Sequence, residues 1–245
     1  MNIPLFLNST DGIRNSKSHD FTISFTPELT LNKNKKYYVA LDSLNMSYSW
    51  YNVAASYNNN TLLYSHDSGT NWTTITLPDG NNSYDDLNRY IQQVLQNNGH
   101  SKTGVKLTFI SSLFRVQLTL ENGFQLDLRT GYFSDLIGYN KAIITSTGYG
   151  SSLPDITRSV DNKFIHTNII SDSIISGIQS DILSRFSVDN LPLSYPFYIE
   201  GRRPLYNKIN TNVIKELRIY ITDAFNRLID LNNIPVNMTL LLREE

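Results

Sequence analysis

Apolar and polar residues alternate with a period of two along much of this chain. The segment Phe21–Phe25 shows the alternation, and it returns in residues 72–77 and 217–223. Because successive side chains of a β-strand point to opposite faces of a sheet, these segments predict half-buried strands. Clusters of Asn, Asp, Gly, Ser and Pro, which favour turns, separate them. The pattern therefore restricts the chain to folds made of short strands joined by turns.

Strands are predicted at residues 21–25, 37–44, 61–64, 72–77, 105–110, 114–120, 124–128, 164–170, 182–186, 217–223 and 236–243. Pro27 is expected to end the first of them, because proline cannot donate to a sheet ladder. The second is expected to bury either the odd-numbered residues from Tyr37 to Ser43 or the even-numbered set. No regular alternation of strands and helices is visible. The predicted fold class is therefore all-β, an antiparallel β-sandwich.

At this length the sandwich is expected to be a single jelly roll with long end loops. A double jelly roll would need about sixteen strands, too many for this chain. One inserted amphipathic helix is predicted after Ser83, which is a good N-cap. This helix is predicted to end at Asn97–Gly99. Its apolar stripe is expected to pack in the core rather than to bind a partner. The stripe consists of Leu87, Ile91, Val94 and Leu95.

No composition shift, linker or repeat divides the sequence. We therefore predict a single jelly-roll domain over residues 1–245, with residues 1–20 as a possible N-terminal arm. Deletion of residues 1–18 is expected to leave a folded domain. The N-terminus lacks the basic and apolar regions of a signal peptide, so we expect no secretion. No apolar run is long enough to predict a membrane span.

Composition excludes several kinds of function. The net charge is −1, so the chain has no general basic field for direct binding of nucleic acid. It has no cysteine, which excludes disulfides, thiolate zinc sites and cysteine nucleophiles. Charged residues make up 18% of the chain, and neutral Asn, Ser and Thr supply the remaining polarity. A surface of this kind tolerates close contact with other subunits.

Catalytic and metal-binding patterns are scarce. The four histidines are scattered and are expected to be surface or strand-packed residues rather than metal ligands: His19, His66, His100 and His166. A set of aspartates has no calcium-loop spacing and is expected to form turns and cap the helix: Asp67, Asp79, Asp85 and Asp86. Asp127 and Asp135 could pair as glycosidase carboxylates, but Asp127 is expected to point outward from its strand. We predict no enzyme activity and no catalytic, metal or cofactor site.

Aromatic and basic residues leave two alternatives open. Trp50, Trp72 and the many tyrosines could form a sugar-binding platform, although alternating aromatic residues more often pack in a core. Arg202 and Arg203 follow a Pro-rich stretch and could bind a carboxylate of a partner. A solvated loop is the other interpretation of this pair.

Several different short motifs follow one another along nearly the whole chain. They are FTISF at 21–25, YVALDSL at 38–44, YSWYNV at 48–53, SYDDLN at 83–88, DLR at 127–129, DLIG at 135–138, LPDIT at 153–157, SDSIISG at 171–177, YPF at 195–197 and RIYITD at 218–223. In these motifs and their order, the chain resembles the minor capsid (penton) proteins of Polinton/Maverick elements and the related adintoviruses. Those proteins often have Asp-x-x-Gly-Arg at the last hairpin, where this chain has Asn226 before Arg227. Asparagine also tolerates a left-handed turn.

The resemblance implies a structural virion protein. It implies a homopentamer that occupies the five-fold vertices of an icosahedral capsid, with a double jelly-roll major capsid protein as partner. The protein would be made in the cytoplasm or nucleus of a host cell and would reside in the virion. A carbohydrate- or receptor-binding jelly-roll module, such as a spike or lectin-like protein, is the alternative function.

A ring of identical subunits needs two different faces that meet. Long polar segments without periodicity are the candidates for such contacts: residues 138–162, 192–204 and the arm 1–20. The candidate interface residues are Tyr149, Tyr195, Arg202 and Arg203.

Overall fold

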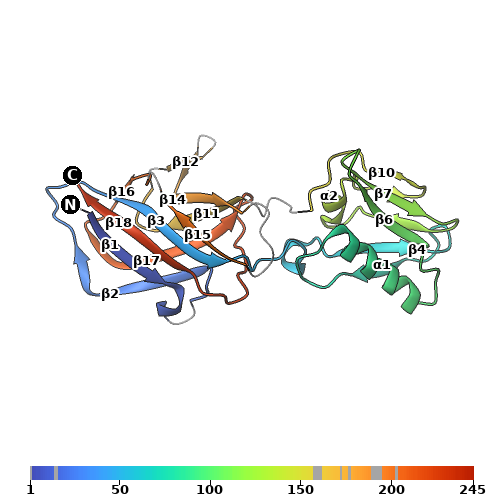
Figure 1. Cartoon of the computed structure of the whole chain (residues 1–245), viewed down its shortest axis with the longest axis horizontal. Coiled ribbons are helices and arrows are strands. Elements are labelled where there is room, and N and C mark those ends of the chain that lie inside the picture. The colour runs from blue at the N-terminus through green and yellow to red at the C-terminus, as the bar shows by residue number, and fades with distance from the viewer. Residues whose placement is uncertain are drawn as a thin grey trace. The chain divides into compact units, whose positions relative to one another are not determined.

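The computed structural model describes residues 2–13, 16–156, 162–171, 173–175, 178–188, 195–201 and 204–245. Two compact units share these residues, where the sequence predicted one domain over 1–245 (Figure 1). The jelly-roll unit contains residues 1–50 and 159–245, and the inserted unit contains residues 51–158. The inserted unit has the same mixture of short strands and polar turns as the rest of the chain, so composition gives no sign of the boundary.

The jelly-roll unit consists of two antiparallel sheets. The first sheet has the order β1 (Asn2–Asn8), β18 (Asn237–Glu244), β3 (Tyr37–Ser47) and β15 (Pro196–Glu200), and β16 (Asn207–Lys208) also pairs with β3. The second has the order β14 (Ile182–Ser187), β11 (Asn162–Thr167), β17 (Val213–Asp223) and β2 (Asp20–Thr30). When the eight main strands are counted along the chain, the sheets join them as 1-8-3-6 and 5-4-7-2. This order is that of a jelly roll, and the predicted fold class is confirmed.

The alternation predicted along the strands places the core of this unit between its sheets. In β17 the side chains of Leu217, Ile219 and Ile221 are fully buried, whereas Arg218 between them is exposed. From the first sheet, Leu44 and other aliphatic side chains are equally buried. The outward-facing positions of both sheets are consequently free to carry polar groups.

Two strands depart from the expected pattern. Pro27 does not end β2, which continues to Thr30 as an edge strand. The pairing of β2 with β17 shifts between Ile214 and Glu216, so Pro27 lies in an irregular stretch, where no ladder bond is required of it. In β3 the buried positions change from odd to even numbers after Leu41, because the pairing with β18 also shifts there. Neither of the two alternating sets predicted for β3 is therefore buried throughout.

The N-terminal residues belong to the sheet. Residues 2–8 pair with β18 in continuous register, with Leu7 opposite Met238. Leu7 is 5% exposed, whereas its neighbour Phe6 is 79% exposed. The segment predicted as a possible free arm over residues 1–20 thus contributes an edge strand and a core side chain. The expectation that residues 1–18 can be deleted without loss of folding does not agree with this pairing.

The inserted unit has its own hydrophobic core. One sheet has the order β5 (Thr73–Thr76), β4 (Thr61–Ser65), β8 (Gln125–Asp127) and β9 (Ile143–Ile144). The other has the order β10 (Gly148–Tyr149), β7 (Arg115–Leu120) and β6 (Val105–Ile110). Two helices, α1 (Tyr84–Asn97) and α2 (Phe133–Ile137), complete the unit. Its core is a cluster that includes Leu62, Ile91, Leu107, Leu126 and Leu136.

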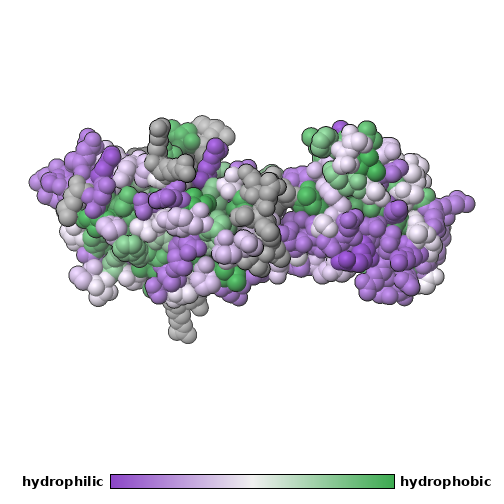
Figure 2. Space-filling view, in the orientation of Figure 1, coloured by the Kyte–Doolittle hydropathy of each residue, from purple (hydrophilic) through white to green (hydrophobic). Residues whose placement is uncertain are grey.

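Helix α1 forms where the sequence predicts it. The Ser83 hydroxyl accepts a hydrogen bond from the backbone of Asp86, and the Asp86 carboxylate accepts one from the backbone of Ser83. This reciprocal capping box satisfies backbone donors that the first turn leaves free. Leu87, Ile91 and Leu95 are fully buried. The opposite side of α1 forms part of a hydrophilic surface of the inserted unit (Figure 2).

Three smaller features complete the described structure. The 3-10 turns η1 (Ser9–Asp11) and η2 (Ala55–Tyr57) follow β1 and precede β4. The short strands β12 (Ser173–Ile175) and β13 (Ile178–Ser180) pair with each other. Within the described ranges, no helix combines the length and the apolar character that crossing a membrane would demand.

Candidate functional site

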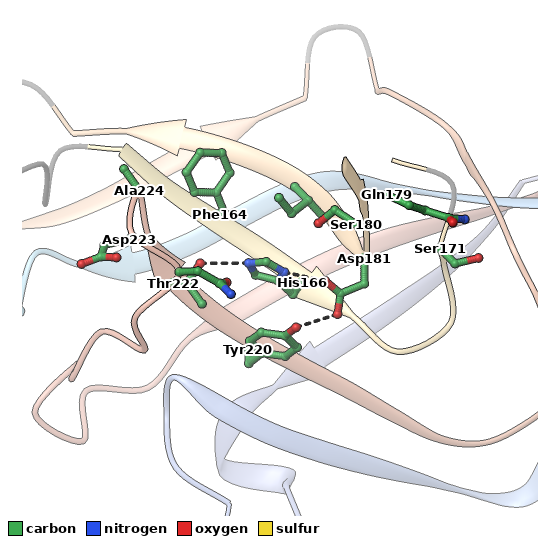
Figure 3. A pocket seen from close by; sticks show the side chains of 12 residues that line it. Phe164, His166, Ser171, Gln179, Ser180, Asp181, Tyr220, Thr222, Asp223 and Ala224 are labelled. Atoms are coloured by element: carbon green, nitrogen blue, oxygen red, sulfur yellow. Dashed lines mark hydrogen bonds and ion pairs between the residues drawn. The ribbon is translucent and has the colours of Figure 1, made fainter. Parts of the chain in front are cut away.

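A cavity of about 660 Å³ opens on the second sheet of the jelly-roll unit. Its lining comes from β11 and Ser171 beyond it, from β17 with the turn that follows it, and from the end of β13, Asp181 and the start of β14 (Figure 3). Pockets of this volume commonly hold small ligands or peptide side chains. The lining residues are Phe164, His166, Ser171, Gln179, Ser180, Asp181, Ile182, Tyr220, Thr222, Asp223, Ala224 and Asn226.

The pairing of β11 with β17 gathers the central side chains. In the antiparallel register Phe164 lies opposite Thr222, and His166 lies opposite Tyr220. Their neighbour Ile165 is fully buried and points into the core. Because side chains alternate between faces, the four residues share the outer face of the sheet.

His166 makes hydrogen bonds to a carboxylate and to a hydroxyl. Its Nδ1 lies 2.8 Å from Oδ1 of Asp181, and its Nε2 lies 2.9 Å from Oγ1 of Thr222. An ionised carboxylate can only accept, so Nδ1 donates to Asp181. In the neutral imidazole Nε2 then accepts from the Thr222 hydroxyl. His166 is 3% exposed, so these two bonds satisfy both ring nitrogens of a buried side chain.

Tyr220 completes the network on the other oxygen of the same carboxylate. Its hydroxyl donates to Oδ2 of Asp181 at 2.6 Å (Figure 3). Its ring stacks on that of His166, with centroids 4.4 Å apart and planes inclined by 8°. Burial and the bond to Asp181 raise the pKa of Tyr220 to about 12, so the hydroxyl remains a donor at neutral pH. Burial alone would raise the pKa of Asp181, but the bonds from Tyr220 and His166 outweigh it and hold that pKa below 3.8.

The network continues to the edge strand β2. Arg218 donates through Nε and Nη2 to both oxygens of Asp20, at 2.8 and 2.7 Å. The Arg218 guanidinium also lies 4.9 Å from the centre of the Tyr220 ring. Bidentate pairs of this kind fix the orientation of both partners. The outer face is thus held in one arrangement from β2 to the segment before β14.

The second carboxylate of the cavity is already occupied. Asp223 accepts hydrogen bonds from the backbone of Phe225 and Arg227 and from Nε of Arg227. Asn226 in this turn has φ of 60°, in the left-handed region. Asn226 thus adopts the left-handed conformation that asparagine was predicted to tolerate at this hairpin. Asp223 consequently acts as the anchor of the turn.

A hydroxyl, an imidazole and a carboxylate in sequence also form the triads of hydrolases. Here the hydroxyl belongs to Thr222, which is 2% exposed. A nucleophile has to reach the carbonyl carbon of its substrate, and the low accessibility of Thr222 does not favour this role. The bonds of this network fix the orientations of Asp181, His166 and Tyr220.

The predicted interface residues are distributed over both units. Tyr149 lies in β10 of the inserted unit and is 52% exposed. Tyr195 precedes β15 of the jelly-roll unit and is 58% exposed. Arg202 and Arg203 lie outside the described residues. The two tyrosines present the accessible rings that a contact would need.

The other histidines have separate surroundings. His19 is buried in the turn before β2, and burial lowers its pKa against the opposing charge of Asp230. His66 and His100 stack in the inserted unit, with ring centres 3.9 Å apart. In the part of the chain that the structure describes, no three potential ligands gather around a metal position.

Three sequence interpretations concern carboxylates and tryptophans. Asp67 and Asp86 hold a turn and a helix N-terminus, as predicted. Asp127 alternates with the buried Leu126 and Leu128, and its carboxylate accepts hydrogen bonds from Nε and Nη2 of the exposed Arg129. The side chain therefore lies away from the core, as predicted, but Arg129 covers it and leaves it 7% exposed. Trp50 is 1% exposed and packs edge-on against Phe197, as a core residue does.

Sequence reasoning missed most of the cavity. It placed His166 and residues 217–223 in strands, but it did not identify Asp181, Tyr220 or Thr222 as members of one site. The alternation that buries Ile219 and Ile221 does place Tyr220 and Thr222 together on the outer face. For Asp181, which precedes its strand, the sequence contains no comparable signal.

The fold defines the class of the molecule, an eight-stranded jelly roll that carries an inserted unit between its third and fourth strands. A crystal structure of the mavirus penton protein has this fold, with a TM-score of 0.56 at 10% sequence identity. The similarity covers 100% of this chain and 100% of the penton chain. No protein-family model and no curated protein sequence matches the chain. At such low identity the similarity shows a common fold.

Proposed function

We propose that this chain is a minor capsid (penton) protein of the Polinton/Maverick type. The observation that carries the proposal is the full-length similarity to the mavirus penton protein, which extends over both units. The ordered motifs along the sequence support the same assignment independently of the coordinates. In this role the chain is a structural component of a virion and has no enzymatic task.

The assembly in this proposal is a homopentamer at the five-fold vertices of an icosahedral capsid. Its partners are further copies of itself and a double jelly-roll major capsid protein, without direct contact to nucleic acid. The low charge density supports it, since neutral polar groups can be buried at a subunit contact at smaller cost than unpaired charges. Synthesis in the cytoplasm or nucleus of a host cell, followed by incorporation into the virion, belongs to the same proposal.

The mass and symmetry of the purified protein test this proposal. Light scattering after size exclusion should give about 140 kDa for a closed ring of five. Class averages of negatively stained particles should show five-fold symmetry. A stable trimer would contradict the penton role. Where the chain alone is monomeric, addition of the major capsid protein must produce vertices that contain it, or the proposal fails.

Tyr149 and Tyr195 remain the proposed contact residues. Tyr149→Ala and Tyr195→Ala should each lower the fraction of pentamer, because exposed aromatic rings often anchor contacts. Tyr198→Ala is the matched control, since Tyr198 is 62% exposed and is not in the predicted set. An equal effect of all three variants would remove the assignment.

A second function is favoured by a smaller cavity of about 260 Å³ on the outer face of the first sheet. Its lining includes amides from three neighbouring strands and the exposed ring of Phe6: the amides are those of Asn8, Asn45 and Asn237. Amides that both donate and accept, beside an aromatic face, suit a neutral carbohydrate. A glycan array with the wild-type protein and Asn45→Ala tests this function.

A further inference from the structure

We propose that the cavity beside Asp181 binds an organic cation with an apolar stem. Such a group is the guanidinium or ammonium end of an arginine or lysine side chain from a partner protein, or a free polyamine. The proposal goes beyond the penton role and stands independently of it. It rests on the charge of one carboxylate, on the aromatic ring of Phe164 in the same cavity and on the space in front of them.

The charge in the cavity belongs to Asp181. Among the described residues, its side-chain partners are the imidazole of His166, which donates from Nδ1, and the neutral hydroxyl of Tyr220. A carboxylate has about four acceptor positions, and these two bonds together with one from its own backbone leave a position open. The Asp181 side chain is 34% exposed, so a ligand can reach it.

Nearby groups do not compete for this carboxylate. Arg218 is held by both oxygens of Asp20 on the adjacent edge strand. Arg227 donates to Asp223, the other acidic residue of the lining. These two arginines are therefore bound elsewhere. Arg185 of β14 lies opposite Phe164 and is exposed, but among the described residues it forms no ion pair with Asp181, which keeps acceptor capacity to spare.

The walls suit a cation that has an apolar stem. Phe164 supplies an aromatic ring, and cations are attracted to aromatic faces. The rings of His166 and Tyr220 stack on each other, and Arg218 already lies over the Tyr220 ring. Ile182 and Ala224 offer apolar contact for methylene groups. Figure 3 shows Phe164 on one side of the network and Gln179 and Ser180 on the other. A carboxylate, an aromatic ring and an apolar wall together suit a cation on an alkyl stem.

The network also prepares the site. Since His166 and Tyr220 each hold one oxygen of Asp181, the carboxylate is fixed before a ligand arrives. A preorganised acceptor gains affinity because less freedom is lost on binding. Thr222 fixes the imidazole from its far side. The four side chains thus form a rigid acceptor on the floor of the cavity.

Nuclear magnetic resonance of the full chain with labelled histidine tests the proposal. The chain contains four histidines, so His166 can be assigned by a single substitution. The probe is N-acetyl-arginine methylamide, and its neutral isostere N-acetyl-citrulline methylamide is the control. We expect the His166 signals to shift and saturate at about millimolar arginine derivative, and to remain unchanged with the citrulline derivative. Equal shifts with both, or no saturation with arginine, would overturn the proposal.

Two variants locate the binding. Asp181→Asn keeps the size of the side chain but removes its charge, and it should weaken binding of the arginine derivative at least tenfold. Asp230→Asn, at a carboxylate whose side chain is 70% exposed, is the matched control and should bind as the wild type does. If Asp181→Asn perturbs folding, Phe164→Leu replaces it, with an expected loss of severalfold. Unchanged binding in a folded variant at either position would refute the site.

Spermidine distinguishes the two sources of the cation. If spermidine shifts the same His166 signals with higher affinity than the arginine derivative, the ligand is a free polyamine. If the arginine derivative binds more tightly, the ligand is a side chain of a partner. Either result supports the cation site, and neither depends on whether the protein forms rings.

Discussion

The hydroxyl of Tyr220 lies 2.6 Å from Oδ2 of Asp181, and this bond ties the outer face of β17 to the segment that precedes β14. Both groups are matched for it, since Asp181 stays ionised and Tyr220 stays protonated over the neutral range. The pair therefore acts as a cross-link between elements that are distant in the sequence.

Replacement of Tyr220 by phenylalanine should break this cross-link with little change in packing. We expect a loss of about 1–2 kcal/mol in the free energy of unfolding, because the bond is to a charged acceptor that is partly exposed. The pKa of Asp181 should rise toward 3.8, because it loses one of the donors that lower it. Urea unfolding and carboxyl carbon shifts measure the two effects. Tyr195→Phe, at a 58% exposed ring, is the control, and an equal loss in both variants would contradict the prediction.

Acidification should weaken the same region. The pKa of Asp181 is lower in the folded protein than its ordinary value of 3.8, so its ionised form stabilises the fold. This contribution is fully present above pH 3.8 and is lost as the pH falls through the lower pKa of the folded state. The fall in stability over this interval should be smaller in Asp181→Asn, which has no carboxylate to protonate. Parallel curves for the two proteins in acid urea titrations would show that Asp181 plays no part.

Gly138 is expected to resist substitution. Its φ is 72°, at the end of α2, and a Cβ atom there would lie 2.5 Å from the carbonyl oxygen of Ser152. Gly138→Ala should therefore lower the free energy of unfolding by about 2 kcal/mol or more. Gly148→Ala is the control, because an added Cβ at Gly148 meets nothing within 4 Å. Thermal unfolding of the two variants provides the comparison, and similar midpoints would disprove the strain.

The N-cap of α1 should matter more than the helix surface. Ser83→Ala removes the acceptor for the backbone of Asp86 and should cost about 1 kcal/mol. Gln93→Ala changes an exposed side chain of the same helix and should have almost no effect. Circular dichroism during urea titration measures both. The capping box would lose its assigned role if Ser83→Ala were as stable as the wild type.

Neighbouring residues of β1 distinguish a strand from a free arm. Leu7→Ala should cost about 2–4 kcal/mol, since Leu7 is 5% exposed and its removal leaves a cavity. Phe6→Ala should change stability by less than about 0.5 kcal/mol, since Phe6 is 79% exposed. A free arm would make both changes neutral, and urea unfolding tells the two cases apart.

Sequence reasoning predicted the elements that depend on near neighbours. Helix α1 was correct from Ser83 to Asn97, because capping and helical spacing involve residues within four positions of one another. The strand at residues 105–110 was also correct, because alternation is visible in a single segment. The fold class followed from these elements together.

Predictions that depended on pairing were less successful. The change of buried face in β3 after Leu41 arises from its partner β18, about which the segment itself contains no information. The same holds for Pro27, which is tolerated because β2 lies at a sheet edge. Asp127 is buried because the Arg129 side chain lies over its carboxylate, and alternation along the strand does not predict this burial.

By itself, the sequence determined a neutral, cysteine-free chain of alternating strands with one capped helix. Only the tertiary structure decided that residues 51–158 form a unit of their own and that residues 2–8 form the edge strand of a sheet. It also decided the cavity, where His166 meets Thr222 from 56 residues away and Asp181 meets Tyr220 from 39 residues away. The physical reason is that hydrophobic alternation fixes which face of each strand is buried. Strand order and register are fixed by contacts between distant segments, and those contacts bring the polar groups of the outer face together.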